Sequence, residues 1–173
     1  MLETDAELTA LQDLLDRSFA ASGTHLKSIV TGERRLTAVQ VANYLQGVKH
    51  VSFATVSRKG EPRVAPLDGW FLHGQFIVST AGNAMRTRHV RRNPSVSLAH
   101  VVGDDIGIWV HGTARFATRG DPLVDDYDRL ATEAYGSSPV NWGDVVVMPI
   151  EARAMFAYAP DPSKFENADQ NTE

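Results

Sequence analysis

The feature that most restricts the fold is a series of short β-rich runs separated by turn residues, which begins at Val48. HVSFATV, QFIVST and SVSLAHVV are runs of this kind, and SRKGEP, HG and GDD are turn signals between runs. Such runs with frequent turns are typical of antiparallel sheets and barrels. We therefore predict an antiparallel barrel, with an interrupted segment in RVAPLDGWFL and a final strand broken at Pro149.

The run IGIWVHGTARF has a regular alternation of side chains. Ile106, Ile108 and Val110 are apolar, whereas Trp109 and His111 lie between and after them. Successive side chains of a strand point to opposite faces. This strand is therefore predicted to have two different faces, with Trp109 and His111 together on one of them.

Four helices are predicted around these strands, one of them in the arginine-rich segment 84–92. Apolar residues from Leu8 to Phe19 follow helical spacing, and Thr37 with Gln40 forms a capping box for a second helix. A third helix is predicted in GDPLVDDYDRLATEAYG, where Asp121 caps the start and a glycine ends it. The chain is thus divided into an N-terminal helical extension (1–46), a barrel domain (47–159) and a disordered tail (160–173).

The composition excludes several classes of function. The chain has no cysteine, which excludes disulfides, thiolate metal sites and cysteine nucleophiles. Its formal net charge of -4 argues against a general polyanion binder, so nucleic acid is not an expected partner. No apolar run is long enough to cross a bilayer, and the acidic start MLETDAELTALQDLLDRSF differs from a secretory signal. We expect a cytoplasmic protein with no membrane partner.

The segment STAGNAMRTRHVRRNP concentrates positive charge in a short predicted helix. Asn83 is its expected N-cap and Pro94 marks its end. Its arginines are Arg86, Arg88, Arg91 and Arg92. At about 100° per residue, the last three cluster on one side, while Arg86 lies on the side of Val90. Val90 is a large aliphatic residue, so Arg86 is predicted to face the barrel at the positive end of the helix dipole.

A cation in the position of Arg86 favours a bound anion. A phosphate fits, because backbone N–H groups at the helix N-terminus and the guanidinium can share its oxygens. Ser79 and Thr80 end the preceding run and could add hydroxyl donors. The alternative is that the arginines are solvated or paired with acidic residues, as charged faces usually are. For the other three arginines both interpretations stay open.

The order of strand, RKGEPRVAP, strand, IVSTAGNAMRTRHVRRNPSVSL and IGIWVHGTARF resembles a known split-barrel family. This family includes the pyridoxamine 5′-phosphate oxidases and the flavin- or deazaflavin-dependent oxidoreductases, and the resemblance covers about residues 40–159. In the oxidases a basic helix ending in Asn-Pro cradles the phosphate of FMN. Arg86 occupies the lysine position of that motif, Val90 the leucine position, and Asn93-Pro94 close it. The resemblance implies a mainly β, antiparallel split barrel with flanking helices.

The motif also departs from the oxidases, because Ala84-Met85 stand where they have Ser-Arg. AMRTRHVRRNP is more similar to the branch that uses the deazaflavin coenzyme F420. F420 carries a phosphodiester and a polyanionic glutamate tail, which would give Arg88, Arg91 or Arg92 a ligand. The resemblance therefore implies F420 or FMN as the cofactor, with F420 to be tested first.

The implied function is an oxidoreductase that transfers a hydride between F420 or FMN and a small organic substrate. Because the cofactor performs this chemistry, no side chain is named as catalytic. In the family, the segment matching Val64 to Leu67 runs beside the flavin ring, and a homodimer completes the pocket. Pyridoxamine 5′-phosphate oxidation itself is not expected, because no second phosphate-binding group is evident. The candidate cofactor-binding residues are Arg63, Val64, Ala65, Pro66, Leu67, Ser79, Thr80, Met85, Arg86, Arg91, Trp109 and His111.

Other features have alternative interpretations. Trp109 and His111 either reach the cofactor or dimer partner or serve only in packing. Trp142 either borders the substrate side of the pocket or anchors a loop. No metal site is expected, because the histidines lack a recognised ligand spacing. The alternative function is a non-catalytic flavin- or haem-binding split barrel, such as a carrier, sensor or haem-utilisation factor, in which His111 could be an axial ligand.

Overall fold

The computed structural model describes residues 1–165, and its centre is a closed barrel of six antiparallel strands. The strands are β1 (Lys49–Val56), β2 (Pro62–Leu72), β3 (Gln75–Ala81), β4 (Ser95–Val102), β5 (Ile106–Ala114) and β6 (Val145–Tyr158). Around the barrel they follow the order β1-β2-β3-β6-β5-β4, and β4 closes on β1. The predicted mainly β, antiparallel barrel with flanking helices is confirmed.

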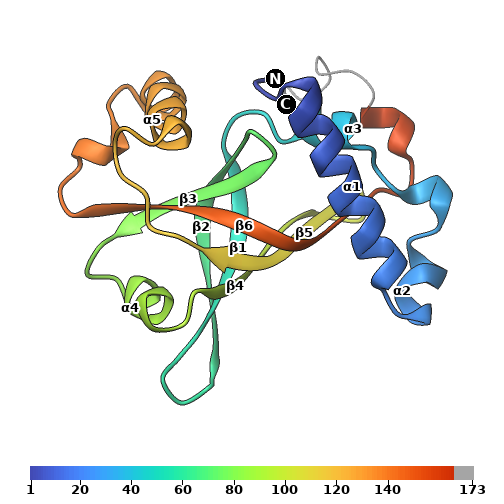
Figure 1. Cartoon of the computed structure of the whole chain (residues 1–173), viewed down its shortest axis with the longest axis horizontal. Helices are drawn as coiled ribbons and strands as arrows, with labels where there is room; N and C mark the ends of the chain where they lie inside the picture. Colours follow the sequence, from blue (N-terminus) through green and yellow to red (C-terminus); the bar gives the residue numbers. More distant parts are fainter. Residues whose placement is uncertain (166–173) are drawn as a thin grey trace.

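Helices surround the barrel (Figure 1). They are α1 (Asp5–Ala21), α2 (Thr24–Ile29), α3 (Ala38–Tyr44), α4 (Met85–Arg92) and α5 (Pro122–Tyr135), with 3-10 turns at Gly32–Arg34, Pro139–Asn141 and Pro162–Phe165. Capping boxes at Thr4 and Thr37 begin α1 and α3, and Asp121 caps α5. Helix α2 was not predicted from the sequence. Among residues 1–165, no helix is both long and apolar enough to span a membrane.

One hydrophobic core joins the N-terminal helices to the barrel. Leu11 and Leu15 of α1 and Val41 of α3 are buried in the same cluster as the barrel residues Phe53 and Ile108. Burial of such a side chain contributes about 1.5–3 kcal/mol, so these helices are part of the packed core. The predicted alternation in β5 is confirmed, because its apolar residues are buried and its two aromatic ones are not.

Two predicted strand interruptions are wrong. Pro66 lies within a continuous β2, opposite Ser52 of β1. Pro149 lies within a continuous β6, opposite Ile77. Its carbonyl accepts a hydrogen bond from the N–H of Arg115, which lies just beyond the end of β5. Because β5 has already ended there, the missing N–H of the proline costs the β5–β6 pair no hydrogen bond.

The predicted disorder from residue 160 onward is wrong for residues 160–165. Pro162–Phe165 form a 3-10 turn, and the Phe165 ring lies 5.2 Å from the Tyr44 ring, edge to face. The Gln40 side chain also donates a hydrogen bond to the Pro162 carbonyl. These contacts hold the segment against α3. The remainder of the predicted tail, 166–173, lies outside the described residues.

Strands β2 and β3 pair with each other over only part of their length. Gly69–Leu72 pair with Gln75–Val78 around a tight turn in which His73 and Gly74 have φ values of 52° and 74°. Beyond this hairpin, 62–68 of β2 pair only with β1, and 79–81 of β3 pair only with β6. We call this stretch, where the two strands separate, the split.

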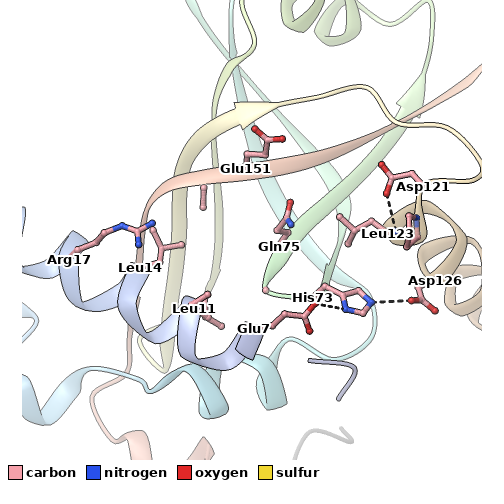
Figure 2. A pocket seen from close by; sticks show the side chains of 14 residues that line it. Glu7, Leu11, Leu14, Arg17, His73, Gln75, Asp121, Leu123, Asp126 and Glu151 are labelled. Atoms are coloured by element: carbon pink, nitrogen blue, oxygen red, sulfur yellow. Dashed lines mark hydrogen bonds and ion pairs between the residues drawn. The ribbon is translucent and has the colours of Figure 1, made fainter. Parts of the chain in front are cut away.

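His73 connects the hairpin to two helices that are far apart in the sequence. Its Nδ1 lies 3.0 Å from a carboxylate oxygen of Glu7 in α1, and its Nε2 lies 3.0 Å from one of Asp126 in α5 (Figure 2). Both ring nitrogens donate only when the imidazole is protonated. Burial lowers the pKa of His73, but its interactions with Asp126 and Glu7 outweigh burial and raise the pKa above its usual value.

Candidate functional site

Two cavities lie on successive stretches of the split. The first, of about 620 Å³, is lined by Arg63, Val64 and Ala65 of β2 and by the start of α4. The second, of about 460 Å³, is lined by 66–68 of β2 and 79–81 of β3. Because consecutive residues of β2 line the two cavities in turn, an elongated ligand could extend along both. We call them the basic cavity and the aromatic cavity.

Positive charge dominates the basic cavity. Its lining includes the six basic residues Arg58, Lys59, Arg63, Arg86, Arg88 and Arg92. Glu61 is the only carboxylate among its lining residues, and it is paired with Arg63 at 2.6 Å. One carboxylate cannot balance six cations, so the cavity attracts anions. The cations come from the β1–β2 turn as well as from α4.

Helix α4 is fixed against the barrel by three buried residues. The Thr87 hydroxyl donates a 2.8 Å hydrogen bond to the Ala81 carbonyl at the end of β3. The His89 ring nitrogen lies 2.9 Å from the Thr55 hydroxyl of β1, and Val90 is buried in the core. This arrangement agrees with the predicted helical phase, in which Val90 faces the barrel.

The start of α4 leaves hydrogen-bond donors available. The prediction of Asn83 as N-cap is wrong, because the N–H of Ala84 bonds the Ala81 carbonyl and the helix begins one residue later. Ala84 is therefore the N-cap, and it has no side chain that can accept from the first turn. Arg86 follows directly, and its buried Nε has no hydrogen-bond partner among residues 1–165. An unpaired guanidinium N–H beside an uncapped helix N-terminus fits a phosphate.

The aromatic cavity has a different lining, with no lysine or arginine. The Tyr135 hydroxyl of α5 donates a 2.9 Å hydrogen bond to the Asp68 carboxylate of β2. The Tyr127 hydroxyl donates one of 2.8 Å to the Ser79 hydroxyl. Burial raises the pKa of Tyr135, and the hydrogen bond to Asp68 raises it further. Burial likewise raises the pKa of Tyr127, so both phenols stay neutral donors near pH 7.

The structure brings nine of the twelve predicted site residues to the split. Those in the basic cavity are Arg63, Val64, Ala65, Met85 and Arg86, and those in the aromatic cavity are Pro66, Leu67, Ser79 and Thr80. Arg91 lies outside both cavities, with its guanidinium 5.5 Å from the centre of the Phe116 ring. Trp109 and His111 lie on the outer face of β5, where they border a separate depression beside α1 and α2.

The contacts of Trp109 and His111 are local. The Trp109 ring stacks on Phe156 of the neighbouring strand with a centroid separation of 5.2 Å. Nδ1 of His111 lies 2.8 Å from the Ser97 hydroxyl across the β4–β5 pair. Within this chain, the two residues are therefore not brought to the split.

Several residues that line the two cavities are not among the site residues predicted from the sequence. Arg58 and Lys59 lie in the predicted turn SRKGEP, and the signal that could identify them is two adjacent cations just before a β-strand. Tyr127 was assigned to the core, which is correct for its ring, but its hydroxyl reaches Ser79. Asp68 and Tyr135 are separated by 67 positions, and no local pattern predicts their contact.

A third cavity, of about 710 Å³, lies between α1, the β2–β3 turn, α5 and β6 (Figure 2). Most of its charged side chains are already paired, either within the lining or with Arg115 outside it. Glu7 and Asp126 share His73, and Asp121 pairs with Arg115 at 2.5 Å, which lowers the pKa of Asp121. None of the predicted site residues lines it. The split is therefore the better candidate site.

The fold and the site together define an antiparallel split barrel with a cavity rich in basic residues in its split. The family model described as "Pyridoxamine 5'-phosphate oxidase" matches residues 38–160. The chain belongs to the pyridoxamine 5′-phosphate oxidase family. A search of curated proteins gives no significant match.

Solved structures share this fold at low sequence identity. The conserved hypothetical protein Rv2991 from Mycobacterium tuberculosis is 15% identical, with a TM-score of 0.65 over 80% of this chain and 94% of that chain. An F420 reductase is 19% identical, with a TM-score of 0.52 over 64% and 91%. HutZ, the heme storage protein from Vibrio cholerae, is 16% identical, with a TM-score of 0.55 over 69% and 92%. These likenesses establish the fold alone.

Proposed function

We propose that this protein is an oxidoreductase that binds F420, or FMN, along the split and transfers a hydride between it and a small organic substrate. The observation that carries the proposal is Arg86, whose buried guanidinium nitrogen has no partner among the described residues and lies in the first turn of an uncapped helix. Family membership and the resemblance of the arginine segment to the F420-using branch support the same conclusion.

The residues of the split have distinct roles in this proposal. Arg86 and the first N–H groups of α4 hold the phosphate. Arg58, Lys59 and Arg88 add positive charge that pairs with the glutamate tail of F420, a group that FMN lacks. Pro66 and Leu67 border the flavin or deazaflavin ring at the aromatic cavity. When bound, the cofactor supplies the hydride chemistry, and the protein orients it and excludes water.

A homodimer in the cytoplasm is the proposed state of the protein. Large apolar side chains remain exposed on the outer face of the barrel, including Val64 at 68% and Val101 at 63% exposure. Trp109 lies on this outer face as well. Exposed apolar side chains of this size favour a protein interface. A second copy of the chain on this face would bring Trp109 and His111 into contact with the dimer partner, which is one of the roles predicted for them from the sequence.

The proposal is tested by titrating the purified protein separately with F420, FMN and haem while recording absorbance spectra. We expect F420 to bind at micromolar concentration and more tightly than FMN. Absence of binding by both flavins at that concentration would refute the proposal. A haem Soret band that disappears in His111→Ala, without flavin binding, would instead support the non-catalytic haem-binding alternative.

A further inference from the structure

The aromatic cavity contains a carboxylate without a strong cationic partner. Asp68 accepts its hydrogen bond from the neutral Tyr135 phenol. Its other oxygen lies 3.6 Å from Nε2 of His50, whose side chain is 91% exposed. No lysine or arginine among residues 1–165 forms an ion pair with Asp68. The negative charge of Asp68 is therefore available to a ligand in the cavity.

Two aromatic rings form adjoining walls beside this carboxylate. Tyr135 and Trp142 both line the cavity, and their ring centroids are 5.6 Å apart with an interplanar angle of 56°. Trp142 is 56% exposed, which is unusual for so large an apolar ring. Aromatic faces attract cations through their negative quadrupole, most strongly in the case of tryptophan.

The segment that carries Trp142 is held in place by hydrogen bonds. The indole N–H of Trp142 donates a 2.8 Å hydrogen bond to the Ser137 hydroxyl. Arg119 binds the side chains of Ser138 and Asn141 and the carboxylate of Asp128 in α5. An exposed ring that is fixed in this way is a preformed binding surface, and little ordering is needed when a ligand arrives.

We propose that the aromatic cavity binds the substrate as an organic cation, a protonated or quaternary amine without phosphate or carboxylate groups. Asp68 supplies the charge, and Tyr135 and Trp142 supply the aromatic faces. Anionic molecules are disfavoured here because no lysine or arginine lines the cavity, in contrast to the basic cavity. The substrate role rests on the proposed function, whereas cation binding itself does not require the cofactor.

The test uses the full-length protein without cofactor and three probes of similar size. Benzyltrimethylammonium is the cation, benzyl alcohol the neutral molecule and phenylacetate the anion, and isothermal titration measures their affinities. We expect measurable binding of the cation and none of phenylacetate. Equal affinity for the cation and phenylacetate, or binding of phenylacetate alone, would overturn the proposal.

Variants then test whether the cation binds in this cavity. We expect Asp68→Asn to weaken cation binding roughly fivefold and Trp142→Leu roughly threefold. Asp104→Asn, the same change at an exposed carboxylate outside the cavity, is the matched control. An affinity for the cation that does not change in both Asp68→Asn and Trp142→Leu would overturn the assignment.

The proposal and the proposed function fail in different ways. Titration with F420 and FMN reports on the basic cavity, and titration with benzyltrimethylammonium reports on the aromatic cavity. If a flavin binds and the cation does not, only the substrate inference is wrong. If the cation binds and neither flavin does, the cavity is a cation site and the oxidoreductase function is wrong.

Discussion

The two cavities of the split share strand β2 but are built in different ways. The basic cavity takes its cations from two short segments, 58–63 and 86–92, in which the charged residues are near neighbours in the chain. The aromatic cavity combines β1, β2 and β3 with α5 and the segment that follows it. Local sequence therefore encodes the basic cavity, whereas the aromatic cavity depends on where the tertiary fold places α5.

The largest expected effect is a loss of cofactor binding at the basic cavity. Arg86→Ala should weaken binding of F420 or FMN by about 1.5–3 kcal/mol, the scale of a hydrogen bond to a charged group. Absorbance or fluorescence titration measures this loss. Arg91→Ala is the matched control, because Arg91 belongs to the same helix and lies outside both cavities. Unchanged affinity in Arg86→Ala would remove Arg86 from the phosphate site.

The difference between the two cavities also explains what could be predicted from the sequence. Arg86 and Val90 were assigned to the same side of α4 because helical phase is a local property, and the burial of Val90 agrees. The alternation in β5 and the cap at Asp121 were predicted for the same reason. Asp68 was not predicted as a site residue, because its contact with Tyr135 exists only in the folded chain.

The wrong predictions have a similar cause. Proline at 66 and 149 normally weakens a strand, but each occupies a position that keeps the strand continuous. Asn83 is a favourable N-cap type, yet the turn that follows β3 extends to Ala84. In that turn Gly82 approaches Asp144 so closely that a Cβ would clash with its carboxylate. In these cases tertiary contacts override local preference.

A smaller effect should distinguish the two cavities by the pH dependence of their ligand binding. Because the pKa of His73 is raised, its bridge is fully formed below the usual histidine pKa of about 6.5 and is lost as pH rises through the folded value. Hydrogen bonding to Arg129 and His73 lowers the pKa of Asp126. Burial alone would raise the pKa of Glu7, but hydrogen bonds from Thr4 and the charge of His73 lower it. These two carboxylates therefore lose their contributions only as pH falls through their lowered values.

His73→Asn tests this bridge, because asparagine tolerates the positive φ of this position. We expect the wild type to be more stable by about 1 kcal/mol at pH 6 and the difference to shrink by pH 9. Thermal unfolding across this pH range measures it. Since α5 supplies Tyr135, cation binding should weaken at high pH in the wild type, while F420 binding through α4 changes less. Unfolding curves that stay parallel across pH would contradict the role of the bridge.

The smallest expected effect shows which cofactor the basic cavity prefers. Arg88 lines the basic cavity, and its only hydrogen bond among the described residues is a 3.9 Å contact from its guanidinium to the Met85 sulfur. An exposed cation of this kind contributes about 0.5 kcal/mol to an ion pair, and salt screens it. Arg88→Ala should therefore weaken F420 binding about twofold at low salt and leave FMN binding nearly unchanged. The reason is that only F420 has a glutamate tail that can reach a second cation. Titrations of both cofactors at two salt concentrations measure this difference. Equal losses for F420 and FMN would show that Arg88 acts on the shared phosphate end and that the charge of this cavity does not select for the tail.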